Sequence, residues 1–119
     1  MITSVYIAGP MNGIKDCNYP LFQKQTEFLR RLGYSVVSPV ELNLEVGVDR
    51  GANAASIQVK REAMARDCKA ITQECCAMAL LPNWRKSGGT VVEVALAKYL
   101  DFWFLDAMTG IRCDLEEIL

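Results

Sequence analysis

Histidine is absent from the 119 residues of this chain. Without an imidazole, neither a Ser-His nor a Cys-His pair can activate a nucleophile. Acid–base chemistry would therefore fall to Asp, Glu, Tyr, Lys or Cys side chains. The five cysteines are odd in number and include no Cys-x-x-Cys pair. The sequence accordingly predicts no metal site and no disulfide framework, and we expect no cofactor.

Clustered positive charge and long apolar runs are also lacking. The net charge is -1, and the Lys and Arg residues are scattered along the chain. We therefore expect no binding to nucleic acid. No apolar run approaches the length of a membrane span, and Met1 leads into a strand-like segment rather than a basic region followed by a hydrophobic one. We expect a cytoplasmic protein that binds no membrane.

What is present is a globular composition, because 51% of the residues are hydrophobic. The length predicts one domain, residues 1–119, with a real core. Short apolar β-rich runs alternate with helical patterns, which predicts an α/β domain with a parallel sheet and helices on both faces. The expected strands are 5–8, 34–38, 76–81 and 102–105, and the expected helices are 18–33, 56–72, 90–100 and a short one at 114–119. Residues 42–55 read as a long polar loop, a candidate lid.

Two glycine loops follow the first and third predicted strands. They are residues 9–13 and residues 82–90. Because ligands of parallel sheets bind beyond the carboxyl ends of the strands, both loops are candidates for one site. Neither loop carries the dinucleotide fingerprint or a complete P-loop. A nicotinamide enzyme or an ATPase is therefore disfavoured, and a small sugar or a nucleoside monophosphate fits better than a triphosphate.

The second loop opens an apolar helix that contains a single acid. Glycines before a helix start let an anion approach the free backbone N–H groups. Glu93 is the only acid between Thr90 and Leu100. Two interpretations stay open: Thr90-x-x-Glu93 forms a capping box, or Glu93 serves the ligand site. The same helix is apolar all round, which indicates that a neighbouring subunit covers part of it.

Several short motifs, in order and at matching spacing, resemble the nucleoside 2-deoxyribosyltransferase-like superfamily. The nearest branch is a small set of largely uncharacterised bacterial and phage proteins, and the likeness covers roughly residues 4–105. The motifs are Tyr6-Ile7-Ala8-Gly9-Pro10-Met11, Asn18-Tyr19-Pro20-Leu21-Phe22, Arg66-Asp67-Cys68, Leu80-Leu81-Pro82-Asn83-Trp84 and Ser87 to Glu93. The resemblance implies a flavodoxin-like or Rossmann-like three-layer sandwich with a parallel sheet of four to five strands.

The resemblance also implies a reaction, cleavage of the N-glycosidic bond of a deoxynucleoside or a (deoxy)nucleoside 5′-monophosphate. Glu93 would attack C1′ to form a covalent glycosyl-enzyme, Asp67 would handle protons on the base, and Tyr6 would lie near the nucleophile. A serine matching Ser87 binds the phosphate in the monophosphate hydrolases of the family. The expected substrate-binding residues are Gly9, Pro10, Met11, Asn12, Asn83, Trp84, Ser87, Gly88, Gly89 and Thr90. Relatives form homodimers or larger homo-oligomers, and we expect the same here.

Other interpretations of these residues remain open at the level of sequence. Asp67 could be a solvated helix acid, and Tyr6 could be a core residue. Ser87 could be a plain N-cap, and Trp84 could stack on a base or cover the sheet edge. The chain also departs from the family pattern, with Cys76 where an Asp is common and Asn83 where Gly is usual. The alternative functions are a non-catalytic nucleotide-sensing module and a base-exchanging deoxyribosyltransferase.

Overall fold

A computed structural model describes residues 2–47 and 56–119 of the chain. Its centre is a parallel sheet of four strands in the order β2-β1-β3-β4. The strands are β1 (Ser4–Ala8), β2 (Ser35–Val37), β3 (Ala77–Leu80) and β4 (Trp103–Asp106). Strands β1 and β3 pair so that Tyr6 lies opposite Met78 and Ala8 lies opposite Leu80. All four predicted strands are therefore present, with ends that differ by at most one residue.

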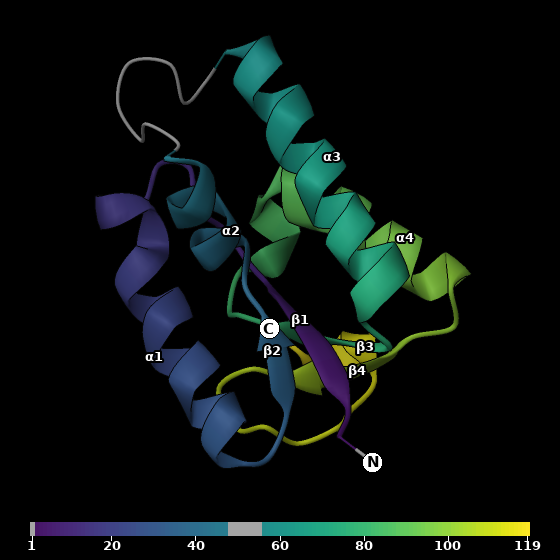
Figure 1. Cartoon of the computed structure of the whole chain (residues 1–119). Coiled ribbons are helices and arrows are strands. Elements are labelled where there is room, and N and C mark those ends of the chain that lie inside the picture. The colour runs from purple at the N-terminus through teal and green to yellow at the C-terminus, as the bar shows by residue number, and fades with distance from the viewer. Residues whose placement is uncertain (1, 48–55) are drawn as a thin grey trace.

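Helices cover both faces of the sheet (Figure 1). Helix α1 (Tyr19–Arg31) packs on one face, and α3 (Ile57–Glu74) and α4 (Gly88–Tyr99) pack on the other. Alternate residues of β1 enter the two cores, with Val5 and Ile7 on the α1 side and Tyr6 and Ala8 on the α3–α4 side. This alternation is the two-residue period of a strand that is buried on both faces. The chain has the flavodoxin-like or Rossmann-like three-layer sandwich that the resemblance implied.

The segment after β2 corrects a sequence prediction. Residues 42–46, expected in a loop, belong to helix α2 (Pro39–Val46). Ser38 caps this helix by accepting a hydrogen bond from the Val40 N–H at 3.2 Å, and Pro39 stands in its first turn. Proline ends a strand but suits the first turn of a helix, and the loop prediction considered only the first property. The rest of the predicted lid, residues 48–55, lies outside the described residues.

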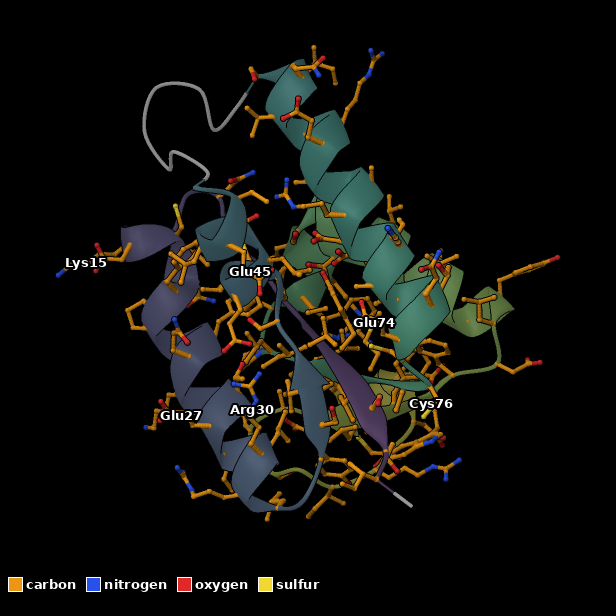
Figure 2. All side chains as sticks on the ribbon, viewed as in Figure 1. Lys15, Glu27, Arg30, Glu45, Glu74 and Cys76 are labelled. Atoms are coloured by element: carbon orange, nitrogen blue, oxygen red, sulfur yellow. The ribbon has the colours of Figure 1, made fainter. Side chains whose placement is uncertain are left out.

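An ion pair holds α2 against α1. The Arg30 guanidinium donates to both carboxylate oxygens of Glu41, at 2.6 and 2.9 Å, and one of its nitrogens also donates to the Val36 carbonyl at 2.9 Å. Figure 2 shows Arg30 near the C-terminal end of α1, whereas Lys15 and Glu27 extend outward. A bidentate pair fixes geometry more strongly than a single contact. Helix α2 is thereby positioned at the carboxyl edge of the sheet, where it forms one wall of the site described below.

Two helix starts differ from the sequence prediction. Helix α4 begins at Gly88 rather than Thr90, because Ser87 is the N-cap and accepts a hydrogen bond from the Thr90 N–H at 3.2 Å. Thr90 is then the third helical residue, so of the two interpretations of Glu93 the capping box with Thr90 is wrong. The expected terminal helix at 114–119 is only a 3₁₀ turn, Leu115–Glu117. Among the described helices, none is long and apolar enough to cross a membrane.

Candidate active site

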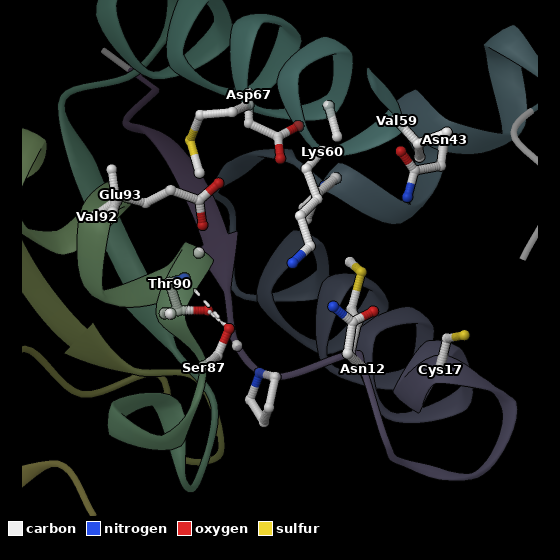
Figure 3. A pocket seen from close by; sticks show the side chains of 18 of the residues that line it. Asn12, Cys17, Asn43, Val59, Lys60, Asp67, Ser87, Thr90, Val92 and Glu93 are labelled. Carbon is white, nitrogen blue, oxygen red and sulfur yellow. Dashed lines mark hydrogen bonds between the residues drawn. The ribbon is translucent and has the colours of Figure 1, made fainter. Parts of the chain in front are cut away.

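A cavity of about 520 Å³ lies at the carboxyl edge of the sheet. Its walls come from the loop after β1, from α1, α2 and α3, and from the loop that leads into α4 (Figure 3). The two glycine loops singled out in the sequence therefore meet at one cavity, as the topology of a parallel sheet predicts. The lining residues are Gly9, Pro10, Met11, Asn12, Cys17, Tyr19, Pro39, Asn43, Val59, Lys60, Ala63, Met64, Asp67, Lys86, Ser87, Gly88, Gly89, Thr90, Val92 and Glu93.

Glu93 enters this cavity from the second turn of α4. Its side chain is only 6% exposed, and its Oε2 accepts a hydrogen bond of 2.8 Å from the Tyr6 hydroxyl. Tyr6 is fully buried in the core beneath α3 and α4 and is not part of the cavity lining. Glu93 is thus held from behind by a core residue of the central strand. A helix cap would instead have turned its carboxyl group back to the Thr90 N–H.

Asp67 reaches the same cavity from α3. Lys60, Ala63, Met64 and Asp67 all line the cavity, and their spacing puts them on one stripe of the helix. Figure 3 shows the carboxyl groups of Asp67 and Glu93 directed into one space. Each of the two carboxyl groups shifts the pKa of the other, and Oδ1 of Asp67 is a buried acceptor without a hydrogen-bond partner. Asp67 is therefore no solvated helix acid.

Burial and mutual charge determine the protonation of this pair. Burial, reinforced by the charge of Asp67, raises the pKa of Glu93 from 4.5 to about 8, against the opposing hydrogen bond from Tyr6. Burial also raises the pKa of Asp67, although the Glu93 hydrogen bond and the nearby Arg66 charge oppose this. Two coupled carboxyl groups in one buried site do not both ionise readily at neutral pH, so the pair retains one proton. Burial likewise raises the pKa of Tyr6 well above 10, which keeps it a hydrogen-bond donor.

Ser87 has two contacts and one unused donor. Its Oγ accepts from the Thr90 N–H at 3.2 Å and from the Thr90 hydroxyl at 3.0 Å, so it is the N-cap of α4. No hydrogen bond found among the described residues uses the hydrogen of the Ser87 hydroxyl. Ser87 also lines the cavity. The cap role and a ligand role are therefore compatible, because capping uses the lone pairs and leaves the hydrogen for an anion.

The glycines at this edge differ in their purpose. A Cβ on Gly9 would lie 2.7 Å from Cβ of Leu81, so Gly9 allows the ends of two neighbouring strands to pack closely. A Cβ on Gly88 would meet no atom within 4 Å. The absence of a side chain at Gly88 leaves the start of α4 open from the cavity. Gly88 thus offers open space beside the backbone for a ligand, whereas the lack of a side chain at Gly9 is required by strand packing.

Asn83 and Trp84, expected to contact substrate, lie outside the cavity lining. Asn83 adopts a left-handed conformation with φ of 66° and precedes the 3₁₀ turn Trp84–Lys86. Trp84 is 6% exposed in the α3–α4 core, and its indole N–H donates to the Ile118 carbonyl at 3.2 Å. The covering role is the one observed for Trp84. Asparagine tolerates the left-handed region better than most residues, which explains why it can replace the glycine usual at this position.

Several lining residues were not anticipated from the sequence. Asn43 of α2 accepts a hydrogen bond from Arg66 of α3 at 2.7 Å and donates to the Tyr19 hydroxyl of α1 at 3.0 Å. This bridge joins three helices along one wall. Lys60 had a readable signal, because it stands two helical turns before Asp67. Asn43 had none, since α2 was not foreseen. Among residues 2–47 and 56–119, no group of three or more acidic, Cys or His side chains could hold a metal.

Comparison with known proteins gives a family but no activity. No curated protein matches the chain. The sequence model of DUF4406, described as a domain of unknown function, matches residues 3–104. That range includes nearly all of the four-stranded sheet and all of the residues that line the cavity. The chain therefore belongs to the DUF4406 family.

Proposed function

We propose that this protein is an N-glycosidase that cleaves the N-glycosidic bond of a (deoxy)nucleoside 5′-monophosphate or a deoxynucleoside. Glu93 is the nucleophile, and Asp67 is the proton donor to the departing base. The observation that carries this proposal is the pair of buried carboxyl groups in one cavity, with Glu93 fixed by the Tyr6 hydroxyl at 2.8 Å. The resemblance to the nucleoside 2-deoxyribosyltransferase-like superfamily points to the same reaction.

The closeness of the two carboxyl groups favours a covalent intermediate. Single displacement needs carboxyl groups roughly 6.5–9.5 Å apart, so that a water fits between them and the sugar. Double displacement needs a separation of only about 5 Å. The carboxyl groups of Glu93 and Asp67 face one space, and each shifts the pKa of the other, so the two groups are close neighbours. Attack by Glu93 itself on C1′ therefore fits the geometry better than attack by water.

The shared proton suits the two steps of this reaction. The first step needs the shared proton on Asp67, so the proton passes from Glu93 to Asp67 within the coupled pair. Asp67 then delivers it to the base as the C1′–N bond breaks, and the Glu93 carboxylate forms the C1′–O bond. Water then attacks C1′ and returns a proton to Asp67, which releases Glu93. Tyr6 donates to one carboxylate oxygen of Glu93 throughout and leaves the other free to react. Tyr6 is thus a positioning residue.

The loop into α4 supports a phosphorylated substrate. The unused Ser87 hydroxyl hydrogen and the free backbone N–H groups at the start of α4 are donors for an anion. We propose that they bind the 5′-phosphate together with the loop of residues 9–12. Asn83 and Trp84 are not part of this proposal. The same donors would serve a hydrolase or a transferase, and the acceptor, water or a second base, is decided by experiment.

The test is base release from a panel of deoxynucleosides and their 5′-monophosphates. We expect wild-type protein to liberate free base from at least one monophosphate, and we expect Glu93→Gln to abolish that activity. Addition of a second free base separates exchange from hydrolysis, because a transferase would form a new nucleoside. Tight binding of a nucleotide without base release would instead indicate a sensing module and contradict the proposal.

A further inference from the structure

Lys60 is a cation that lines the cavity and has no role in the reaction proposed above. It lies on the α3 stripe that ends in Asp67, two turns away along the helix. Figure 3 shows its side chain extending from α3 across the cavity, with the amino group directed toward the loops that carry Ser87 and Asn12. The side chain points away from its neighbour on the stripe, Asp67. Its reach is toward the opposite wall.

Lys60 has no anion partner among the residues that the structure describes. The ion pair found in that part of the chain joins Arg30 and Glu41, which lie outside the cavity. The acids of the lining are Asp67 and Glu93, and they hold one proton between them at neutral pH. Lys60 and Lys86 are the cations of the lining. The described lining therefore carries an excess of positive charge, which a neutral nucleoside would leave uncompensated and a monophosphate would neutralise.

We propose that Lys60 binds the phosphate of the substrate from the α3 side, opposite the Ser87 hydroxyl, and so selects phosphorylated over unphosphorylated nucleosides. The inference rests on the proposed function, because that function identifies the sugar as the (deoxy)ribose of a nucleotide. It extends that function by assigning the choice of substrate to a residue on a different element from the glycine loop. A lysine suits this task, because its ammonium group on a flexible four-carbon stem can adjust its position to the bound anion.

Direct binding measurements test the assignment without relying on turnover. The probes are 2-deoxyribose 5-phosphate and 2-deoxyribose, together with a matched deoxynucleoside and its 5′-monophosphate. Binding of each probe is measured by titration calorimetry. The variants are Lys60→Gln and Lys60→Arg, and Lys69→Gln is the matched control. Lys69 is an exposed lysine of the same helix that does not line the cavity.

The expected pattern separates charge from shape. Lys60→Gln weakens binding of both phosphorylated probes by about tenfold or more, as loss of a charged hydrogen bond does. It changes binding of the unphosphorylated probes by less than about twofold. Lys60→Arg retains most of the phosphate affinity, and Lys69→Gln changes nothing. Equal losses on both kinds of probe would overturn the inference, as would failure of the wild-type protein to bind either phosphorylated probe.

The same experiment keeps the two proposals apart. If phosphate binding depends on Lys60 but no base is released from any substrate, Lys60 is the anion-binding residue and the glycosidase proposal fails. If base release depends on Glu93 but Lys60→Gln affects nucleosides and monophosphates alike, the glycosidase stands and the Lys60 assignment fails.

Discussion

At the scale of single residues, Glu93 concentrates the chemistry of the site. Its carboxyl group is almost fully buried, faces a second carboxyl group and accepts a hydrogen bond from a core tyrosine. Burial and the Asp67 charge favour its protonated form, and Tyr6 favours its ionised form. A group balanced between two states at neutral pH is suited to change state during a reaction.

The first prediction concerns the pH dependence of base release. Activity requires one proton on the Asp67–Glu93 pair, with Asp67 as acid and Glu93 as nucleophile. Because the pKa of Glu93 is raised to about 8, the pair loses its last proton as pH rises through that value. We expect kcat/KM to fall about tenfold per pH unit above pH 8, and to fall again in acid where both groups are protonated. Initial rates from pH 4 to 10 measure this, and a flat profile would exclude the shared proton.

The second prediction concerns stability. The folded-state pKa of Glu93 is about 8, against an ordinary value of 4.5. The folded protein therefore binds more protons than the unfolded chain between these values, and it loses stability as pH rises from about 4.5 to about 8. Glu93→Gln removes this loss. We expect the variant to exceed wild type by a few kcal/mol at pH 9 and by much less at pH 5, at about 1.4 kcal/mol per pKa unit.

Thermal unfolding of both proteins at a series of pH values provides the measurement. The Tm difference between variant and wild type should grow with pH. A difference that is constant with pH would mean that Glu93 is not buried as a protonated group. Substitution of the exposed Glu74, on α3 but outside the cavity, serves as the control and should leave the pH dependence unchanged.

At the scale of elements, the start of α4 joins stability to ligand binding. Ser87 accepts two hydrogen bonds from Thr90 and keeps a free donor hydrogen. We expect Ser87→Ala to cost about 1 kcal/mol of stability through loss of the cap. We also expect it to weaken monophosphates more than nucleosides, since only the former would use the free hydrogen. Chemical denaturation and binding assays measure the two effects, and equal losses on both ligands would leave Ser87 a cap alone.

The same elements show what the sequence could and could not predict. Strands were foreseen because four buried apolar runs alternate with helical patterns, and topology alone then placed both glycine loops at one edge. Helix α2 was missed because Pro39 both ends β2 and begins a helix. The Gly88-Gly89 start of α4 was missed because glycine is a poor helix former, yet the Ser87 cap overrides this weak preference. The sequence left open whether Trp84 stacks on a base or covers the sheet edge, because the left-handed backbone conformation of Asn83 just before it was not foreseen.

The hydrogen bond between Tyr6 and Glu93 could not be predicted from the periodicity of the sequence. The period of β1 predicts that Tyr6 and Ala8 share a face, but nothing local says which helix residue their face meets. Asp67 and Glu93 were expected at one site through the family resemblance. Their protonation, by contrast, follows from burial and distance, which only the packed structure supplies.

At the scale of the whole molecule, apolar surface remains uncovered. A neighbouring subunit was predicted to cover part of helix α4, and in the single chain Val91, Val92 and Tyr99 are 44%, 51% and 85% exposed. Val92 also lines the cavity. We propose that a second copy of the chain covers this side of α4 in a homodimer or larger homo-oligomer.

Light scattering over a concentration series tests the assembly. We expect a mass at least twice that of the monomer of 13.3 kDa. Tyr99→Glu, which places a charge on the exposed side of α4, should dissociate the assembly while leaving the helix formed, as judged by circular dichroism. A monomer at all concentrations would show that the apolar side of α4 stays open to water.

The bond from Tyr6 to Glu93 also bears on the order of events as the chain folds. Its two residues are 87 positions apart, and Asp67 stands between them on a third element. The loop that this bond closes spans most of the chain, and contacts of such long sequence separation form late because their closure entropy is lost before they return any stability. The nucleophile can meet its partner only after all 87 of these positions have been synthesised. Before that point Asp67 and Glu93 would have the pKa values of exposed carboxyl groups. The raised pKa values of the pair therefore arise only when the site is folded.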